Sequence, residues 1–307
     1  MARYVRVSAI SFSGAGGETE EEKKENNIRA MCGLIEKACW DGPDIVITPE
    51  FFNVLGCERY VDLAETTDGE TVGRLSELAR RYKTWIACAM PERDGDKVYN
   101  SCILINRDGF PVGSYHKMHP TIGEIEQGIT PGLESRPFQT DFGPIAFAIC
   151  FDLNFRDVIE SAMRDRSRSP RLICFPSMYR GGIQARIWAH DFGIWFASAI
   201  TGPHSSIINP MGKVMAISEA YNPIVSSVVN LDYVVCHIDY NDAKFDEIKR
   251  KYGKGVELDI YSPEGRFILY SHMDGKSAED IVEEFELETL ESYFERANRV
   301  RMEALSR

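Results

Sequence analysis

Apolar residues alternate with polar ones, or run together in short blocks, along most of residues 1–240. Val5 to Phe12 alternate with the period of a strand, and a charged run leads from there into a helical pattern that reaches about Trp40. Further helical patterns fall at 71–83, 155–164 and 184–198. Strand-like segments are predicted at 44–48, 84–90, 98–106, 111–116, 143–150, 171–175, 204–209, 213–217, 224–230 and 233–239. Helices and strands therefore interleave, which favours mixed sheets covered by helices.

The pattern changes after Asp239. Residues 240–275 are rich in Lys, Asp, Gly and Tyr, and residues 277–304 have the pattern of one long acidic helix that starts with a Ser277/Asp280 capping box. Its apolar stripe consists of Ile281, Phe285, Tyr293, Ala297 and Val300. We therefore divide the chain into a first domain of residues 1–240 and a C-terminal extension of residues 241–307. The stripe is expected to pack either on its own core or on a second subunit.

Composition indicates a globular protein of enzyme size. Of the 307 residues 44% are hydrophobic, and 47 acidic residues against 35 basic ones give a formal net charge of -12. Because this charge repels phosphate backbones and anionic membranes, we expect neither nucleic acid nor a membrane as a partner. The eight cysteines contain no C-x-x-C pair, which is typical of reduced thiols in the cytoplasm. The histidines lack the spacing of a metal site, and we predict no metal and no cofactor.

Three predicted strands end at side chains that can do chemistry. Glu50 follows the apolar run at 44–48, Lys117 follows the strand at 111–116, and Cys150 ends the apolar run at 143–150. A single cysteine is more often inert core filling than a nucleophile. A thiol, a carboxylate and an ammonium group at three strand ends together predict a hydrolytic site.

Four segments around these residues resemble a known family. They are Thr48-Pro49-Glu50-Phe51, Tyr115-His116-Lys117-Met118-His119, Thr130-Pro131-Gly132 and Ile149-Cys150-Phe151-Asp152. In their order and distances, and with the turn at 209–212, they resemble the nitrilase, or carbon-nitrogen hydrolase, superfamily over about residues 4–240. The resemblance implies an α/β fold, a four-layer αββα sandwich of two mixed β-sheets flanked by helices, with the C-terminal helical tail beyond it. It also implies a Glu-Lys-Cys triad at the strand ends.

The resemblance and the residue types suggest a role for each group. Cys150 would be the nucleophile, and Glu50 the general base that takes the thiol proton and later activates water. The ammonium group of Lys117, helped by a backbone N–H of Phe51 or Phe151, would stabilise negative charge on the carbonyl oxygen. We expect a nearby base or cation to lower the pKa of the thiol.

Many members of this family carry a second glutamate between the lysine and the Pro-Gly turn. Glu124 and Glu126 both fall in that interval, and the Pro-Thr-x-x-Glu spacing favours Glu124. The arginine that is common after the cysteine-containing segment is replaced, since Leu153 and Asn154 follow Asp152. Without a guanidinium group to hold a carboxylate, an N-carbamoyl amino acid is a disfavoured substrate.

Aromatic residues around these segments suggest a substrate pocket. The candidates for substrate contact are Phe51, Phe151 and Tyr179. Trp188 is a further candidate, whereas Trp195 and Phe196 fit a buried face of the helix at 184–198 equally well.

These observations predict a cofactor-independent amidohydrolase that cleaves a small linear amide through a thioester and releases ammonia or an amine. A nitrilase that converts a nitrile to a carboxylic acid would use the same residues and is the first alternative. A non-catalytic scaffold with the same fold, whose C-terminal helix is a partner surface, is the second. We expect a cytoplasmic homodimer or higher homo-oligomer that acts on a small-molecule amide or nitrile.

Overall fold

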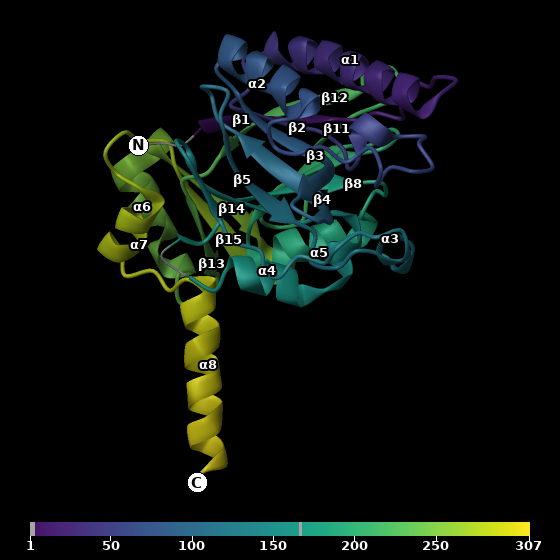
Figure 1. The fold of residues 1–307 in the computed structure, drawn as a ribbon. Coiled ribbons are helices and arrows are strands. Elements are labelled where there is room, and N and C mark those ends of the chain that lie inside the picture. The colour runs from purple at the N-terminus through teal and green to yellow at the C-terminus, as the bar shows by residue number, and fades with distance from the viewer. Residues whose placement is uncertain (1–3, 166–167) are drawn as a thin grey trace. The chain divides into compact units, whose positions relative to one another are not determined.

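The computed structural model describes residues 4–165 and 168–307, whose contacts divide them into two units (Figure 1). The larger unit comprises residues 5–229, and the smaller one comprises Tyr4 with residues 230–307.

The larger unit contains two six-stranded mixed sheets, with the strand orders β12-β1-β2-β3-β4-β5 and β11-β10-β9-β8-β7-β6. The strands of the first sheet are β1 (Tyr4–Ile10), β2 (Ile45–Ile47), β3 (Trp85–Asp94), β4 (Lys97–Ile105), β5 (Pro111–His116) and β12 (Ile224–Asn230). Those of the second are β6 (Phe138–Thr140), β7 (Gly143–Phe147), β8 (Leu172–Ser177), β9 (Trp195–Ile200), β10 (Ser206–Ile208) and β11 (Val214–Ile217). The strands β1 to β3 and β7 to β9 are parallel, and β3 to β5 and β9 to β11 are antiparallel. Every residue of β2, β8 and β9 is buried, which explains their uninterrupted apolar runs.

Helices cover the two sheets of this unit (Figure 1). The helices are α1 (Glu20–Cys39), α2 (Glu70–Tyr82), α3 (Ile122–Glu126), α4 (Arg156–Ala162) and α5 (Gly182–Phe192). On the first sheet, Ile35 of α1 and Leu75 of α2 share one buried core with Val46 and Ile86. On the second, α5 contacts β9, while β2 of the first sheet contacts β8 of the second. The layers are therefore helix, sheet, sheet and helix, and the predicted αββα sandwich is confirmed.

The helix predicted at 184–198 is wrong in its second half. The helix α5 ends at Phe192, because Gly193 takes the left-handed conformation, with φ of 57°, and closes it with an N–H to Ala189 O bond. Trp195 and Phe196 belong to the strand β9, where Phe196 pairs with Ile173 of β8. Their burial comes from the centre of a sheet, not from a helix face.

The smaller unit is built on an antiparallel sheet of order β13-β15-β14. Its elements are β13 (Tyr233–His237), α6 (Phe245–Tyr252), β14 (Val256–Tyr261), β15 (Arg266–Ser271), α7 (Ala278–Glu284) and α8 (Leu290–Leu305). Residues 240–275 thus hold a helix and two strands that the sequence pattern did not indicate. The strand β14 is only partly buried, with no clean alternation of apolar and polar side chains, and this weakens the pattern. Within the described residues no helix is long and apolar enough to cross a membrane.

The single helix predicted at 277–304 is two helices. The predicted box is confirmed, since Ser277 Oγ accepts from Asp280 N and Asp280 Oδ2 accepts from Ser277 N, at 3.1 and 2.7 Å. The first helix, however, ends at Glu284, and Glu286 has a positive φ of 48°. Thr289 then caps the second helix through a bond from Ser292 N. Ile281 is buried, whereas Ala297 and Val300 are exposed.

Candidate active site

A buried lysine joins two glutamates at one end of the first sheet. Lys117 follows β5 and is 1% exposed, and its Nζ donates to Glu50 Oε1 at 2.9 Å and to Glu124 Oε2 and Oε1 at 2.9 and 3.1 Å. Although burial opposes a charge there, the neighbouring carboxylate of Glu50, with that of Glu124, raises the pKa of Lys117. The lysine therefore stays an ammonium ion at any physiological pH. Glu126, the alternative second glutamate, is exposed at the surface.

Asn100, in the strand β4, holds the same two glutamates from a second direction. Its Nδ2 donates to Glu50 Oε1 and to Glu124 Oε1, both at 2.7 Å, and its backbone oxygen accepts from Lys117 N at 2.8 Å. Its Oδ1 has no hydrogen-bond partner within the described residues. The two carboxylates therefore fix the orientation of this amide, because a flipped amide would point its oxygen at both of them.

The carboxylate of Glu124 is ionised by its surroundings. Burial alone would raise its pKa, but Lys117, the Thr121 N–H and Asn100 all donate to it and hold its pKa below the ordinary value. The short helix α3 supplies the Thr121 bond through a capping box, with Thr121 N to Glu124 Oε2 at 2.7 Å. This box was not predicted from the sequence.

Both carboxylate oxygens of Glu50 accept hydrogen bonds. Oε1 accepts from Lys117 and Asn100, and Oε2 accepts from the Met178 N–H at 2.9 Å. Glu50 lies three residues beyond the end of β2, and the next residue, Phe51, has a left-handed φ of 53°. The turn after β2 therefore holds the carboxylate rigidly beside the loop that follows β8.

Cys150 lies where β7 gives way to a 3₁₀ turn at Cys150–Asn154 and has a positive φ of 49°. A non-glycine residue in this region is strained, which is common at functional sites. Burial and the negative charge of Glu50 raise the pKa of the Cys150 thiol to about 12, against the opposing effects of Lys117 and the Met178 N–H. The expectation of a lowered thiol pKa is therefore wrong for the resting protein, in which the thiol keeps its proton.

Asp152 fastens the cysteine turn to the lysine segment. Its carboxylate is fully buried and accepts from Ile149 N at 2.8 Å, from the Tyr115 hydroxyl at 2.7 Å and from His119 N at 2.8 Å. Burial raises the pKa of Asp152 to about 6, although these three donors oppose the shift. The bonds on both sides fix the distance between the segments of Cys150 and Lys117.

Four aromatic residues lie around this cluster. Phe51 is buried and packs on Tyr60 with ring centres 5.0 Å apart, and burial together with the nearby Glu124 carboxylate raises the pKa of Tyr60 to about 12. Tyr179 is half-buried, and burial and the nearby Cys150 raise its pKa to about 12. Phe151 is 36% exposed. The fold thus brings the three predicted contact residues near the cluster, with Tyr60 as an addition.

Sequence reasoning missed Asn100, Tyr60 and Met178. Asn100 lies within a strand rather than at its end, and only the pairing of β4 with β5 brings it to Lys117. Met178 contributes a backbone N–H, which no side-chain pattern reveals. The sequence gives little sign of Asn100, because β4 also carries Lys97, Tyr99 and Ser101.

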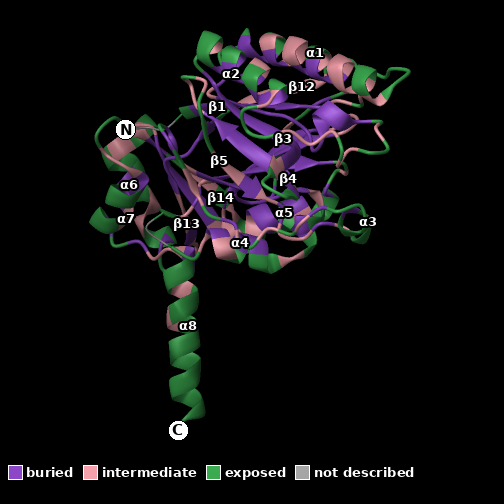
Figure 2. Cartoon of the chain, viewed as in Figure 1, coloured by how far each residue is buried: buried purple, intermediate pink, exposed green. Residues whose placement is uncertain are grey.

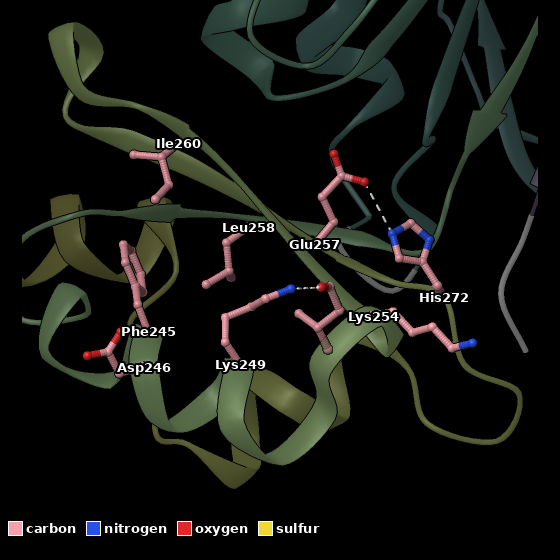
Figure 3. Close-up of a pocket in the computed structure, with 9 residues that line it drawn as sticks. Phe245, Asp246, Lys249, Lys254, Glu257, Leu258, Ile260 and His272 are labelled. Carbon is pink, nitrogen blue, oxygen red and sulfur yellow. Dashed lines mark hydrogen bonds and ion pairs between the residues drawn. The ribbon is translucent and has the colours of Figure 1, made fainter.

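The smaller unit has a separate cavity of about 550 Å³ (Figure 3). Three of its polar side chains are bound to one another or to the backbone, with Lys249 Nζ 2.7 Å from Val256 O and His272 Nε2 3.2 Å from Glu257 Oε2. No cysteine or serine is among its lining residues, which are Phe245, Asp246, Lys249, Lys254, Val256, Glu257, Leu258, Ile260 and His272. Cys150 and its neighbours therefore remain the candidate active site.

Known proteins resemble this chain across the larger unit. The family model for carbon-nitrogen hydrolases matches residues 14–234. The omega-amidase NIT2 of Xenopus tropicalis is 26% identical over 261 residues, covering 76% of this chain and 91% of its own. That of Homo sapiens is 27% identical over 235 residues, covering 68% and 84%.

Solved structures of low sequence identity share the fold. Nit3 of Saccharomyces cerevisiae, a member of branch 10 of the nitrilase superfamily, superposes with a TM-score of 0.65 at 20% identity and covers 82% of this chain and 95% of its own. A mutant amidase from Nesterenkonia sp. AN1, which carries the acetamide moiety of fluoroacetamide on its active-site cysteine, has a TM-score of 0.62 at 17% identity, with coverage of 81% and 96%.

Proposed function

Since the chain belongs to the carbon-nitrogen hydrolase family, we propose that it is an amidohydrolase that cleaves a small linear amide at Cys150 and releases ammonia or an amine. One observation carries this proposal. Glu50 and Lys117, which form a buried ion network with Glu124, both act electrostatically on the Cys150 thiol, although a buried ion pair is weak support for stability alone. A catalytic function explains why such a network is present.

In the first half of the reaction, the Cys150 sulfur attacks the amide carbon while Glu50 takes the thiol proton. Because the resting thiol has a pKa of about 12, the proton moves to Glu50 as the carbon-sulfur bond forms, rather than before it. Glu50 then gives this proton to the leaving nitrogen. The carbon-nitrogen bond breaks, the amine departs, and an acyl thioester remains on Cys150.

In the second half, water attacks the thioester. Glu50 takes a proton from the water, the carbon-sulfur bond breaks, and the proton returns to the sulfur. The products are a carboxylic acid and the enzyme in its starting state, so one water is consumed for each amide cleaved.

Lys117 stabilises the negative charge that develops on the carbonyl oxygen in both tetrahedral intermediates. It is suited to this role because it stays charged and its position is fixed by two carboxylates. The backbone N–H of Phe51 or Phe151 supplies a second donor. Glu124 holds Lys117 in place and balances its charge, and Phe51, Phe151 and Tyr179 contact the substrate.

The substrate class is proposed from two observations. The curated relatives are named omega-amidases, which supports an amide rather than a nitrile. The turn after Cys150 carries Leu153 and Asn154 where a guanidinium group would be needed to hold a carboxylate, which disfavours N-carbamoyl amino acids. We further propose a cytoplasmic location, which the eight free cysteines support.

Ammonia release from a panel of aliphatic amides, carbamoyl amines and nitriles tests the proposal. We expect turnover of at least one amide, none of the nitriles, and loss of activity in Cys150→Ala. A nitrile converted to its acid would replace the amidase by the nitrilase alternative. Full activity in Cys150→Ala would refute the mechanism, and no turnover of any compound would favour the scaffold alternative.

A further inference from the structure

The strand β14 is one edge of the three-stranded sheet in the smaller unit. Its six residues pair with β15 in one unbroken register, and no described strand pairs with its other side. Only Val256 is buried, and the other residues of the strand are intermediate or exposed (Figure 2). Proteins often block such an edge with a bulge or a proline, and β14 has neither. The edge can therefore serve as a template for a further strand.

The register shows which backbone groups of β14 face away from the sheet. His272 N donates to Gly255 O at 2.9 Å, so the odd-numbered residues of this segment exchange their hydrogen bonds with β15. The N–H and C=O groups of Leu258 and Ile260 therefore point outward. Within the described residues these outward groups have no hydrogen-bond partner, and they are free to bind another backbone.

The helix α6 and the strand β14 form a groove along this edge. The cavity of about 550 Å³ in the smaller unit is lined by residues of both elements (Figure 3). Phe245 of the helix and Leu258 and Ile260 of the strand supply its apolar side chains, and Ile260 is 47% exposed. The groove therefore offers apolar contacts beside the free backbone groups, as sites for added strands do.

The two ends of the groove carry opposite charge. Lys249 and Lys254 lie beside the start of β14, where Lys249 Nζ donates to the first carbonyl of the strand at 2.7 Å, and Asp246 lies at the other end (Figure 3). Glu257, the acidic residue at the lysine end, is bound to His272. Within the described residues neither Lys254 nor Asp246 has an ion-pair partner. A chain that runs antiparallel to β14 would bring its C-terminal end to the lysines, so a terminal carboxylate has the complementary charge.

We propose that this groove binds the extended C-terminal segment of another protein, which adds to β14 as an antiparallel strand. The last residue of the segment lies opposite Val256, and its carboxylate lies beside Lys254. The third residue from the end lies opposite Leu258 and the fifth lies opposite Ile260, and each exchanges two hydrogen bonds with the strand. Their side chains point to the same face as Leu258 and Ile260 and pack on Phe245, so these two positions are apolar in the partner.

Binding of short peptides to the whole chain tests this proposal. The probes are hexapeptides Lys-X-Thr-X-Thr-X with a free C-terminal carboxylate, in which each X is Val, Leu or Phe, and a fluorescein on an N-terminal linker reports binding by polarisation. We expect at least one peptide to bind with a Kd below about 100 μM. Methylating the backbone nitrogen of its third residue from the end, which faces β14, should weaken binding at least tenfold. The same change at the second residue from the end, whose nitrogen faces away, should alter binding less than twofold. Failure of every peptide to bind would overturn the proposal, as would equal effects of the two methylations.

Charge reversal in the protein tests the direction of the bound segment. Lys254→Glu should weaken binding of the best peptide at least tenfold, whereas Arg250→Glu, the same charge change on α6 outside the groove, should weaken it less than twofold. Replacing the terminal carboxylate by an amide should weaken binding to the wild type at least tenfold and to Lys254→Glu less than twofold. Tighter binding to Lys254→Glu would overturn the antiparallel direction, and equal losses in both variants would overturn the groove as the site. Circular dichroism checks that both variants are folded.

Discussion

Replacing Asn100 by Asp should convert the active site into one that works only at alkaline pH. The Asn100 amide donates to Glu50 and Glu124 at 2.7 Å each, so an aspartate there would bring a third carboxylate oxygen against two others. Among the described residues Lys117 is the one cation bound to both glutamates, and it cannot balance three negative charges. The three carboxylates would therefore share a proton and titrate as a unit.

The size of the effect follows from Coulomb's law. Two unit charges about 4 Å apart repel by about 4 kcal/mol at an effective dielectric constant of about 20. This energy raises the pKa of the third carboxyl by about 3 units, to near neutrality. Below that pH the proton shared by the three carboxylates occupies Glu50, which then cannot accept the thiol proton. The rate enhancement of roughly 100-fold from general-base catalysis is then lost. The activity of Asn100→Asp should then rise about tenfold per pH unit below its midpoint near pH 7.

The assay is kcat/KM for the best amide between pH 5 and pH 10, for wild type, Asn100→Asp and Asn100→Leu. The leucine variant removes both hydrogen bonds without adding a charge, so its activity should fall without alkaline recovery. An Asn100→Asp profile with the shape of the wild-type profile would refute the reasoning. Alkaline recovery in Asn100→Leu to the same extent would show that lost packing, rather than added charge, is responsible.

Three further predictions concern the thiol, the buried aspartate and the Pro-Gly turn. Burial and the negative charge of Glu50 raise the pKa of the Cys150 thiol, so Glu50→Gln should speed the alkylation of Cys150 by iodoacetamide at pH 8. The same change should reduce turnover at least 100-fold, because the general base is lost. Slower alkylation in this variant would contradict the effect assigned to the Glu50 charge. Because the pKa of Asp152 is about 6 in the folded protein against 3.8 as its ordinary value, its contribution to stability is greatest below pH 4 and falls until pH 6. Urea unfolding should show Asp152→Asn gaining up to about 3 kcal/mol relative to wild type across that window, and a constant difference would count against this. Gly132→Ala would place Cβ 2.1 Å from a backbone carbonyl oxygen beside Lys117 and should lose more than about 2 kcal/mol of stability, whereas Gly123→Ala, with no atom within 4 Å, should be neutral in thermal melts.

The strand ends were predictable from the sequence because a buried strand is an apolar run, and the first polar residue after it is easily located. Lys117 follows β5, which is only partly buried, and its position was predicted from the segment at 115–119 instead. Glu50, three residues after the fully buried strand β2, stands out in this way. Asn100 does not, because its place in the cluster depends on how β4 pairs with β5, and register is a property of the folded sheet. The positions where helices end inside a continuing pattern could not be predicted from the sequence either. The end of α5 at Gly193 and the break at Glu286 each depend on one residue with a positive φ inside a pattern that otherwise continues.

The protonated state of the resting Cys150 thiol determines how fast this side chain reacts with oxidants. Hydrogen peroxide and glutathione disulfide react with thiolates and only slowly with neutral thiols. With a pKa of about 12, only about one molecule in 100,000 carries the reactive anion at pH 7. The enzyme should therefore retain its Cys150 thiol during exposure to oxidants, because burial and the negative charge of Glu50, the proposed general base, both keep the proton on the sulfur.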